Sequence, residues 1–317
     1  MNLRLTPMGL AALFSMTAPG GAGAQTGGGF YLSQDLGGHF TPDLRIDAYA
    51  DNAPGSICDQ YLNPFTDLMP AYCDGGPDAP TTEWVNAFRR GSGVLAGVAA
   101  GYGFGRDGRL RVEAEYFFRE AAYDETSPIR GRGGVAVAKL DGEVVVAEDR
   151  IGSLTSHNLF ANVYCDFPGG GRVTPYVGAG GGMAFTRIDY GLLWVRNGDP
   201  GAITSVAPHF PADRSDDLRV LQSNLASTTS SLQTGLADVL AGYQLLAGLD
   251  FALDDRTTLG AKGRWAQFAE FGDNPVLDRL RSHAPSNRLD GSRPVTGGVT
   301  TRDTGLLAFT ANLEYRF

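Results

Sequence analysis

The chain has 317 residues, a formal net charge of -9, 44 glycines and a hydrophobic share of 43%. The negative charge excludes a broadly basic nucleic-acid-binding protein, and no apolar run is long enough to cross a bilayer as a helix. Two classes of protein fit this composition: a β-barrel that crosses a membrane, in which only every second strand residue is apolar, and a soluble, glycine-rich β protein.

The first 24 residues have the three parts of an export signal. Arg4 is the only charged residue before a mostly apolar stretch, 8–16, and Ala22-Gly23-Ala24 follows a Pro-Gly pair. A positive start, a short apolar run and an A-x-A site are typical of a cleaved signal peptide. We expect cleavage after Ala24 and a single domain over 25–317. The alternative is a buried N-terminal helix.

Strand-like and loop-like stretches alternate along the rest of the chain. The candidate strands cover about 28–40, 92–104, 109–121, 154–167, 173–187, 236–253, 257–270 and 304–317. Their connections alternate between tight turns and long loops. The turns, at 105–108, 168–171 and 254–256, are rich in Gly, Pro and Asp. The long loops cover roughly 41–91, 122–153, 188–235 and 271–303. Strict alternation places all four long loops at one end, which predicts an antiparallel up-and-down barrel of about eight strands.

The candidate strands are apolar on one face and polar on the other. In 110–119 one face carries Leu110, Val112, Ala114, Tyr116 and Phe118, and the other carries Arg111, Glu113, Glu115, Phe117 and Arg119. The stretches 236–253, 257–270 and 304–317 repeat this period of two. In a soluble sandwich the apolar face would be the core, whereas in a membrane barrel it faces lipid and the charges face the lumen.

The lumen of such a barrel would carry five basic and six acidic groups. These are Asp35, Arg111, Glu113, Glu115, Arg119, Asp166, Asp250, Lys262, Arg264, Glu314 and Arg316. Because side chains fill an eight-stranded barrel and buried charges must pair, we expect a structural ion-pair network. The alternative is a small porin-like channel along the same charges. Inward glycines should leave room for the long charged side chains; they are Gly97, Gly101, Gly178, Gly180 and Gly182.

Two segments depart from a plain eight-stranded pattern. Residues 134–148 alternate around a turn at Asp141-Gly142. They form either a further membrane hairpin, which would give ten strands, or a hairpin projecting above the membrane, which we favour because each arm is short. Residues 214–234 contain spaced leucines and predict either a short helix or no regular structure.

The three cysteines have different expected roles. Cys58 and Cys73 lie in one polar segment of the first long loop, and an exported chain meets an oxidising compartment. We therefore expect a Cys58–Cys73 disulfide. Cys165 has no evident partner and is expected to act as a small apolar residue.

No catalytic constellation is evident in the sequence. His39 and His157 fall at strand ends, and His209 and His283 fall in loops. None has a neighbouring Ser and Asp at a spacing that suggests a nucleophile with a positioned base. We expect no enzyme activity, no cofactor and no metal. The acidic first loop lacks a twelve-residue calcium-binding pattern, so its charges are expected to be solvated.

Residues 158–167, Asn-Leu-Phe-Ala-Asn-Val-Tyr-Cys-Asp-Phe, are followed by a glycine-rich turn and by Thr-Pro-Tyr-Val-Gly-Ala-Gly at 174–180. This hairpin resembles the fourth and fifth strands of the outer-membrane β-barrel superfamily, which includes opacity proteins, rickettsial-type surface antigens and the membrane domain of outer membrane protein A. The opening 30–33 and the ending 313–317 fit as well. The resemblance implies that Tyr315 and Phe317 belong to the signal read by the barrel-assembly machinery. It covers about half the chain, and Cys165 stands where relatives often have Tyr.

The sequence thus predicts an integral outer-membrane protein with a structural or surface-interaction role, of the adhesin or antigen kind, in its long outer loops. The expected partners are outer-membrane lipid and lipopolysaccharide, the barrel-assembly machinery and a host or cell-surface ligand, with no nucleic acid. The alternative functions are the small channel and, less favoured, a lipid-modifying enzyme at the rim. Motifs of this kind specify fold better than function.

Overall fold

The computed structural model describes residues 28–51, 63–65, 82–104, 109–131, 142–278 and 295–317. Eight strands close into an antiparallel barrel in the order β1-β13-β9-β8-β7-β6-β5-β4. They are β1 (Gly29–Phe40), β4 (Ser92–Phe104), β5 (Leu110–Pro128), β6 (Val144–Asp166), β7 (Val173–Arg196), β8 (Thr229–Ala252), β9 (Thr257–Phe268) and β13 (Leu306–Arg316). The eight-stranded barrel expected from the sequence is confirmed.

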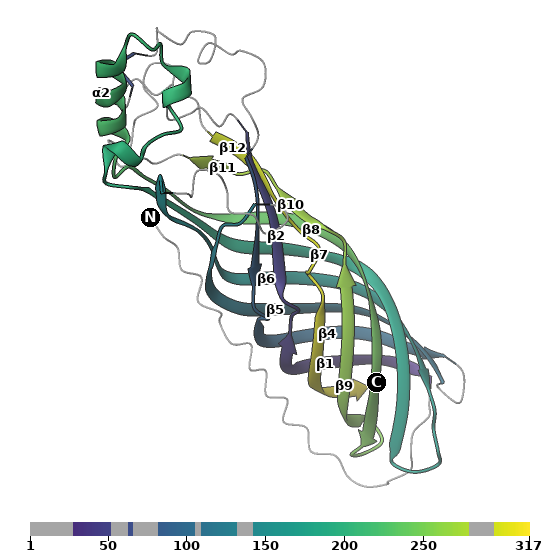
Figure 1. The fold of residues 1–317 in the computed structure, drawn as a ribbon. Helices are drawn as coiled ribbons and strands as arrows, with labels where there is room; N and C mark the ends of the chain where they lie inside the picture. The colour runs from purple at the N-terminus through teal and green to yellow at the C-terminus, as the bar shows by residue number, and fades with distance from the viewer. Residues whose placement is uncertain (1–27, 52–62, 66–81, 105–108, 132–141, 279–294) are drawn as a thin grey trace, which may run out of the picture.

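The seam between the first and last strands closes the barrel. β1 pairs with β13 from Tyr31↔Arg316 to Phe40↔Leu307. At the end of the seam, the Phe317 backbone N–H donates to the Phe30 carbonyl oxygen at 3.1 Å, and the two rings lie 5.8 Å apart. The C-terminal residue therefore lies at the end of the barrel that carries the short turns (Figure 1).

Local chemistry explains the tight turns. In the turn after β8, one carboxylate oxygen of Asp254 accepts the backbone N–H groups of Arg256 and Thr257, both at 2.8 Å. These bonds lower the pKa of the Asp254 carboxyl. In the turn after β6, Gly170 has a φ of +76°, which glycine adopts without steric cost. The third expected turn, 105–108, lies outside the described residues.

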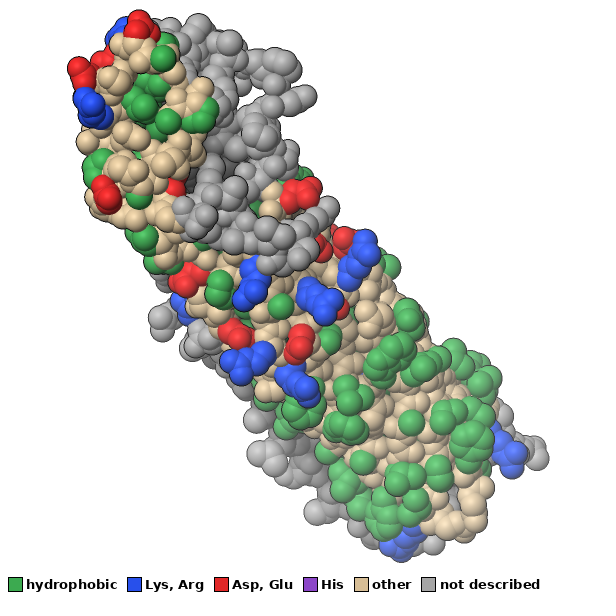
Figure 2. Space-filling view, in the orientation of Figure 1, with side chains coloured by type: hydrophobic (Ala, Val, Ile, Leu, Met, Phe, Trp, Pro, Cys, Tyr) green, Lys and Arg blue, Asp and Glu red, His purple; other side chains and the backbone are tan. Residues whose placement is uncertain are grey.

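An apolar belt surrounds the half of the barrel that lies next to these turns. Figure 2 shows it as a dense field of hydrophobic side chains, bordered on the head side by a band of mixed charges. Its members come from every strand and lie on the face expected to contact lipid. Examples are Leu36, Val98, Val163, Leu245 and Phe309, which are 49–68% exposed. A patch of this extent would be unfavourable in water and fits the hydrocarbon layer of a bilayer.

Four strands continue far beyond the belt. β5, β6, β7 and β8 have 19, 23, 24 and 24 residues, whereas about 9–11 residues cross a membrane. Along each strand the apolar positions change face at the upper edge of the belt. In β7, Met183 and Phe185 are exposed, but beyond them the buried residues are Ile188, Tyr190 and Leu192. Below this point the strand presents apolar side chains to lipid, and above it the strand presents them to an internal core.

A second, smaller sheet covers that core. It has the order β10-β12-β2-β3, with β11 paired to β12. Its strands are β2 (Leu44–Asp51), β3 (Thr82–Phe88), β10 (Phe271–Asp273), β11 (Val276–Asp278) and β12 (Val295–Thr301). They come from the first and last long connections, which were expected to be loops. Together with the extended ends of β5–β8 they form what we call the head (Figure 1).

The third long connection completes the head. It contains the short 3-10 turns η4 (Pro200–Ala202) and η5 (Ala207–His209) and the helix α2 (Ser215–Leu225). Of the two possibilities left open for 214–234, the short helix is correct, but residues from Thr229 onward belong to β8. Of 134–148, the part from Gly142 is described, and Val144 begins β6; the rest lies outside the described residues. Among the described residues, no helix is long and apolar enough to cross a membrane.

Candidate functional site

The lower lumen holds a cluster of ions around Arg111. Its guanidinium contacts Asp166 at 2.9 Å, Glu314 at 2.9 Å and Asp250 at 3.4 Å. Three tyrosine rings lie within 5.1–5.6 Å of the same group, Tyr31, Tyr164 and Tyr176. The Arg111 side chain is 4% exposed. Removing this cation would take away the ion-pair partner of Asp166 and Asp250 and one of the two partners of Glu314, which also contacts Arg316 at 2.7 Å. Leaving buried carboxylates in this way is strongly destabilising.

A second cluster lies higher in the lumen. Lys262 contacts Asp35 at 2.8 Å and Glu115 at 3.8 Å, and Arg264 forms an ion pair with Glu115. Glu113 accepts hydrogen bonds from the hydroxyls of Tyr164 at 2.9 Å and Tyr31 at 3.1 Å. The charges of opposite sign thus contact one another across the barrel, as a packed lumen requires.

The inward glycines have neighbours other than those expected. A side chain at Gly101 would collide with the Tyr31 ring, and one at Gly178 would collide with the Tyr164 ring. At Gly180 the close neighbour is the Asn162 amide. The prediction that these glycines make room for long charged side chains is therefore wrong. They make room for the rings and the amide that pack around the ions.

Arg119 lies apart from both ion clusters. It donates to the backbone carbonyl oxygen of Thr304 at 2.8 Å and lies 5.1 Å from the centre of the Phe268 ring. Within the described residues no carboxylate pairs with it. Sequence alternation correctly places it inside the barrel but does not identify its partners, which come from a segment 185 residues away.

Above the ion clusters the interior becomes apolar. Phe117 stacks against Arg264, with the guanidinium carbon 4.0 Å from the ring centre. Phe160 lies 5.7 Å from Phe117 and 6.1 Å from Phe268, measured between ring centres. One continuous cluster of buried side chains runs from this aromatic layer up to the head. Buried side chains therefore occupy the interior from the ion clusters to the head.

The head has a buried polar contact at its centre. The Trp84 indole N–H donates to a carboxylate oxygen of Asp149 at 2.9 Å, and the Trp84 ring packs edge-on against Trp194 at 6.1 Å. This contact joins β3 of the small sheet to β6 and β7 of the barrel wall. Burial raises the pKa of Asp149 to about 7, while the hydrogen bond from Trp84 partly opposes that rise.

A second buried carboxylate anchors the helical segment. Glu143 accepts backbone N–H groups from Thr204 at 3.2 Å and Ser205 at 2.9 Å, and the Ser205 hydroxyl at 2.8 Å. The Gln222 side chain of α2 donates to the Ile203 carbonyl oxygen at 2.8 Å. These bonds hold η4, η5 and α2 on the barrel wall.

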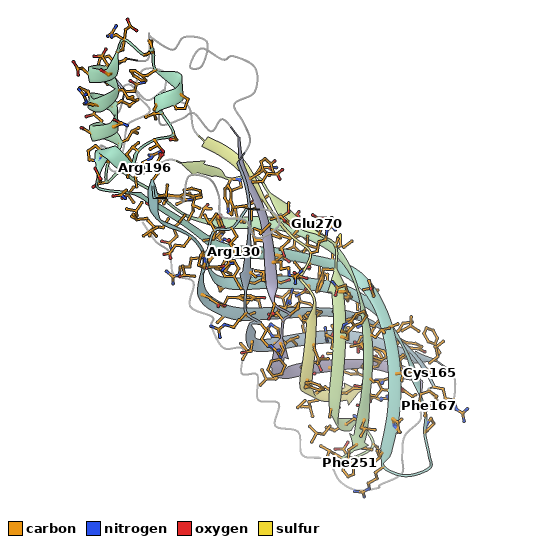
Figure 3. The ribbon with its side chains drawn as sticks, viewed as in Figure 1. Arg130, Cys165, Phe167, Arg196, Phe251 and Glu270 are labelled. Carbon is orange, nitrogen blue, oxygen red and sulfur yellow. The ribbon has the colours of Figure 1, made fainter. Side chains whose placement is uncertain are left out.

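In Figure 3, Arg196, Arg130 and Glu270 lie toward the head, and Cys165, Phe167 and Phe251 lie near the turns.

No family model matches the sequence, and no curated protein matches it. Solved structures give low-scoring matches. Neisserial surface protein A is 10% identical, covers 91% of this chain and 97% of its own length, and has a TM-score of 0.36. The outer membrane protein OprG from Pseudomonas aeruginosa is 12% identical over 92% and 99%, with a TM-score of 0.36. The outer membrane protein AlkL is 13% identical over 96% and 98%, with a TM-score of 0.32.

These scores are too low to place the chain in a family, so the assignment of the fold rests on the strand register and the belt. The fold is an eight-stranded transmembrane β-barrel. At the level of fold, the resemblance drawn from 158–167 and 174–180 is confirmed: these segments form the β6–β7 hairpin, paired from Asp166↔Tyr176 upward.

The remaining predicted residues have different outcomes. The signal residues Ala22 and Ala24 and the cysteines Cys58 and Cys73 lie outside the described residues. Tyr315 and Phe317 lie at the end of the seam, with ring centres 5.3 Å apart. Among the described residues, no group of three or more His, Cys, Asp or Glu side chains could hold a metal ion.

Sequence reasoning missed the polar contacts of the head. A signal for β2 and β3 was present, since Leu44, Ile46 and Ala48 alternate with Arg45 and Asp47, which is the pattern of a half-buried strand. Trp84 and Phe88 also share one face of a strand, with the polar Asn86 between them. The pairing of Trp84 with Asp149 had no signal in the sequence because 65 residues separate them.

Proposed function

We propose that this chain is an outer-membrane protein that binds a partner at the cell surface through its head. The observation that carries the proposal is the construction of the head. Four barrel strands extend past the belt and pack against a second sheet over a shared apolar core. Recognition surfaces are commonly built on rigid scaffolds at the ends of strands. An ordered head of this size is more than the closure of four hairpins requires.

The filled interior supports binding over conduction. A channel needs a continuous polar path, whereas here the two ion clusters are followed by the Phe117, Phe160 and Phe268 layer. The lumenal charges remain the observation that favours a small channel as the second candidate. Their mixed signs and direct pairing are what packing of a narrow barrel requires.

Location and conduction are tested first. The protein expressed in a Gram-negative cell should fractionate with the outer membrane and should migrate differently on gels before and after boiling. Recovery from the soluble periplasm would contradict the proposal. In planar bilayers the purified protein should show no ion conductance. Stable conductance that is lost when Arg111 and Arg264 are neutralised would favour the channel instead.

Binding is tested with a head deletion matched by a control at the opposite end. Asn197 and Ser227 are joined by a backbone hydrogen bond of 3.0 Å, so residues 198–226 can be replaced by a two-residue turn without changing the β7–β8 register. The control replaces the turn residues Asp254, Asp255 and Arg256. Protein reconstituted in nanodiscs is applied to an array of glycans and matrix proteins. Binding to an array component that the control variant keeps and the deletion variant loses supports the proposal. Equal binding by the two variants contradicts it.

A further inference from the structure

A notch interrupts the barrel wall at the upper edge of the apolar belt. β1 ends at Phe40 and β13 begins at Leu306, and beyond these residues the two strands no longer pair. The chain instead runs irregularly through Thr41–Asp43 and through Arg302–Gly305. A cavity of about 680 Å³ occupies this place, a size within the usual range for small-molecule pockets.

The floor of the notch is a row of lipid-facing side chains on three neighbouring strands. Phe40 of β1 pairs with Leu307 of β13, and Leu307 pairs with Trp265 of β9. All three line the cavity, and their exposed fractions are 53%, 44% and 42%. On the lipid-facing side of each strand, they are the large apolar residues nearest the head. The floor is therefore continuous with the membrane-facing belt.

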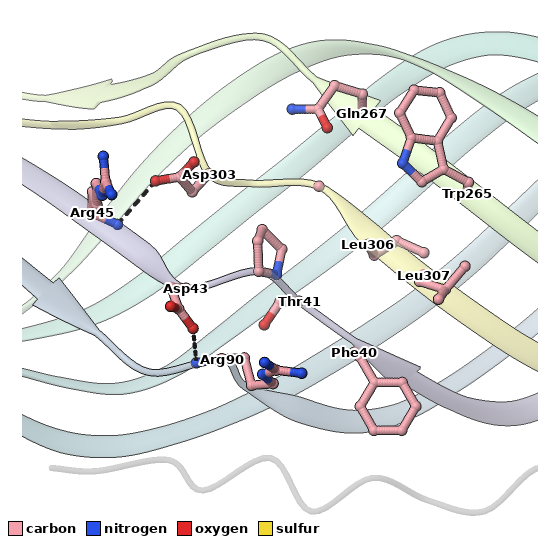
Figure 4. Close-up of a pocket in the computed structure, with 12 residues that line it drawn as sticks. Phe40, Thr41, Asp43, Arg45, Arg90, Trp265, Gln267, Asp303, Leu306 and Leu307 are labelled. Atoms are coloured by element: carbon pink, nitrogen blue, oxygen red, sulfur yellow. Dashed lines mark hydrogen bonds between the residues drawn. The ribbon is translucent and has the colours of Figure 1, made fainter.

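The upper part of the notch is charged. Asp43 accepts the Arg90 backbone N–H at 2.8 Å, and Asp303 accepts the Arg45 backbone N–H at 3.2 Å. Figure 4 shows these two bonds on the head side of the cavity, with Phe40, Leu307 and Trp265 toward the membrane. The bonds fix the backbone around the opening. They leave the guanidinium groups of Arg45 and Arg90 without a carboxylate partner within the described part of the chain.

Other exposed arginines near this rim are paired. Arg89 contacts Glu125 at 3.2 Å, and Arg302 contacts Glu270 at 3.0 Å. Neither lines the cavity. The two guanidinium groups, which have no carboxylate partner among the described residues, therefore line a cavity that joins the lipid-facing surface to the charged band.

We propose that this notch binds a membrane lipid with a phosphate-bearing headgroup, with the phosphate on Arg45 and Arg90 and one acyl chain along Phe40, Leu307 and Trp265. Guanidinium groups match phosphate oxygens in charge and geometry. The apolar floor supplies the chain contacts that a free phosphate would not use. The site lies in the barrel wall and does not depend on the head having a partner.

The test uses the full barrel in uncharged maltoside micelles and a single-chain alkyl phosphate with bromine on its chain. Bromine quenches tryptophan at contact, and Trp265 forms part of the floor. We expect saturable quenching that is lost in Trp265→Phe. The double variant Arg45→Gln with Arg90→Gln should weaken binding at least tenfold, or about 1.4 kcal/mol. The control Arg89→Gln removes a neighbouring exposed charge and should bind like the unaltered protein.

Three results would overturn the proposal. The first is quenching that never saturates and is equal in the double variant, which indicates simple partition into the micelle. The second is equal affinity for a brominated chain with a glucoside or a trimethylammonium headgroup, because the arginines would then not select phosphate. The third is full competition by inorganic phosphate at the same concentration as the lipid, since the acyl chain would then contribute nothing. A heat-dependent gel shift for every variant confirms that each barrel is folded.

Discussion

Replacing Asp149 by Asn should make the docking of the small sheet insensitive to pH. Asp149 is fully buried and accepts the Trp84 indole N–H. It lies above the apolar belt between β3 and the barrel wall, so we expect water to reach it when β3 leaves the wall. Asn has nearly the same shape and keeps an oxygen for Trp84, but it has no carboxyl proton to lose. The variant therefore isolates the effect of ionisation from the effect of packing.

The expected change in the free energy of docking follows from the pKa of this carboxyl. Burial raises it from 3.8 to about 7 in the docked head. The docked state therefore keeps a proton that the open state releases above about pH 4. Docking loses stability as the pH rises from about 4 to about 7, and the loss is constant above that. At about 1.4 kcal/mol per pH unit the full difference is about 4 kcal/mol, so Asp149→Asn should strengthen docking by up to that amount at pH 8 and change it little at pH 4.

Hydrogen exchange of the β2 and β3 amides measures this opening in the folded barrel. The ratio of protection in the variant to protection in the unaltered protein, taken at each pH, removes the intrinsic pH dependence of exchange. Asp189→Asn is the matched control, because Asp189 is an exposed carboxylate on the neighbouring strand β7. A ratio that stays constant between pH 4 and pH 8 would refute the reasoning, as would an equal pH dependence in the control.

Three further predictions concern assembly, the lumen and the first long connection. Deleting Phe317, which closes the seam beside Phe30, should lower the amount of barrel inserted in the membrane and raise periplasmic degradation; unchanged barrel levels would count against it. Arg111→Met should destabilise the barrel by about 3–5 kcal/mol in urea unfolding, because three buried carboxylates lose their shared cation, whereas Arg89→Met at the exposed rim should change stability by less than about 1 kcal/mol. Mass spectrometry of unreduced peptides should find a Cys58–Cys73 bond, and free thiols at both positions in exported protein would exclude it.

The membrane-spanning half of the barrel could be predicted because its environment is uniform. Lipid surrounds it on all sides, so Leu110, Val112 and Tyr116 must be apolar, while Arg111, Glu113 and Glu115 must face inward. Each strand therefore shows this alternation in its own sequence, with a period of two. The tight turns at 168–171 and 254–256 are recognisable by their Gly, Pro and Asp residues. Strand bounds in this half therefore agree with the sequence to within a residue or two.

The upper half could not be predicted in the same way, because there the apolar side chains face inward and the polar side chains face outward. Water replaces lipid outside, so Arg187 and Asp189 face outward, and Ile188 and Tyr190 fill the interior. The predicted strand ended at residue 187, close to the point where the apolar residues change from odd to even positions. The strand itself continues to Arg196. The change of face marks the membrane boundary rather than the end of the strand.

The sequence by itself determined the barrel, the order of its strands and the side on which each lumenal charge lies. These follow from alternation and turn chemistry, which act between near neighbours in the chain. Only the tertiary structure decided which charges meet, that Arg119 contacts the carbonyl of Thr304, and that Trp84 meets Asp149 in the head. It also brought Arg45, Arg90 and Trp265 into the lining of one notch. These contacts join residues far apart in the sequence, and they form only when the closed barrel brings distant strands face to face.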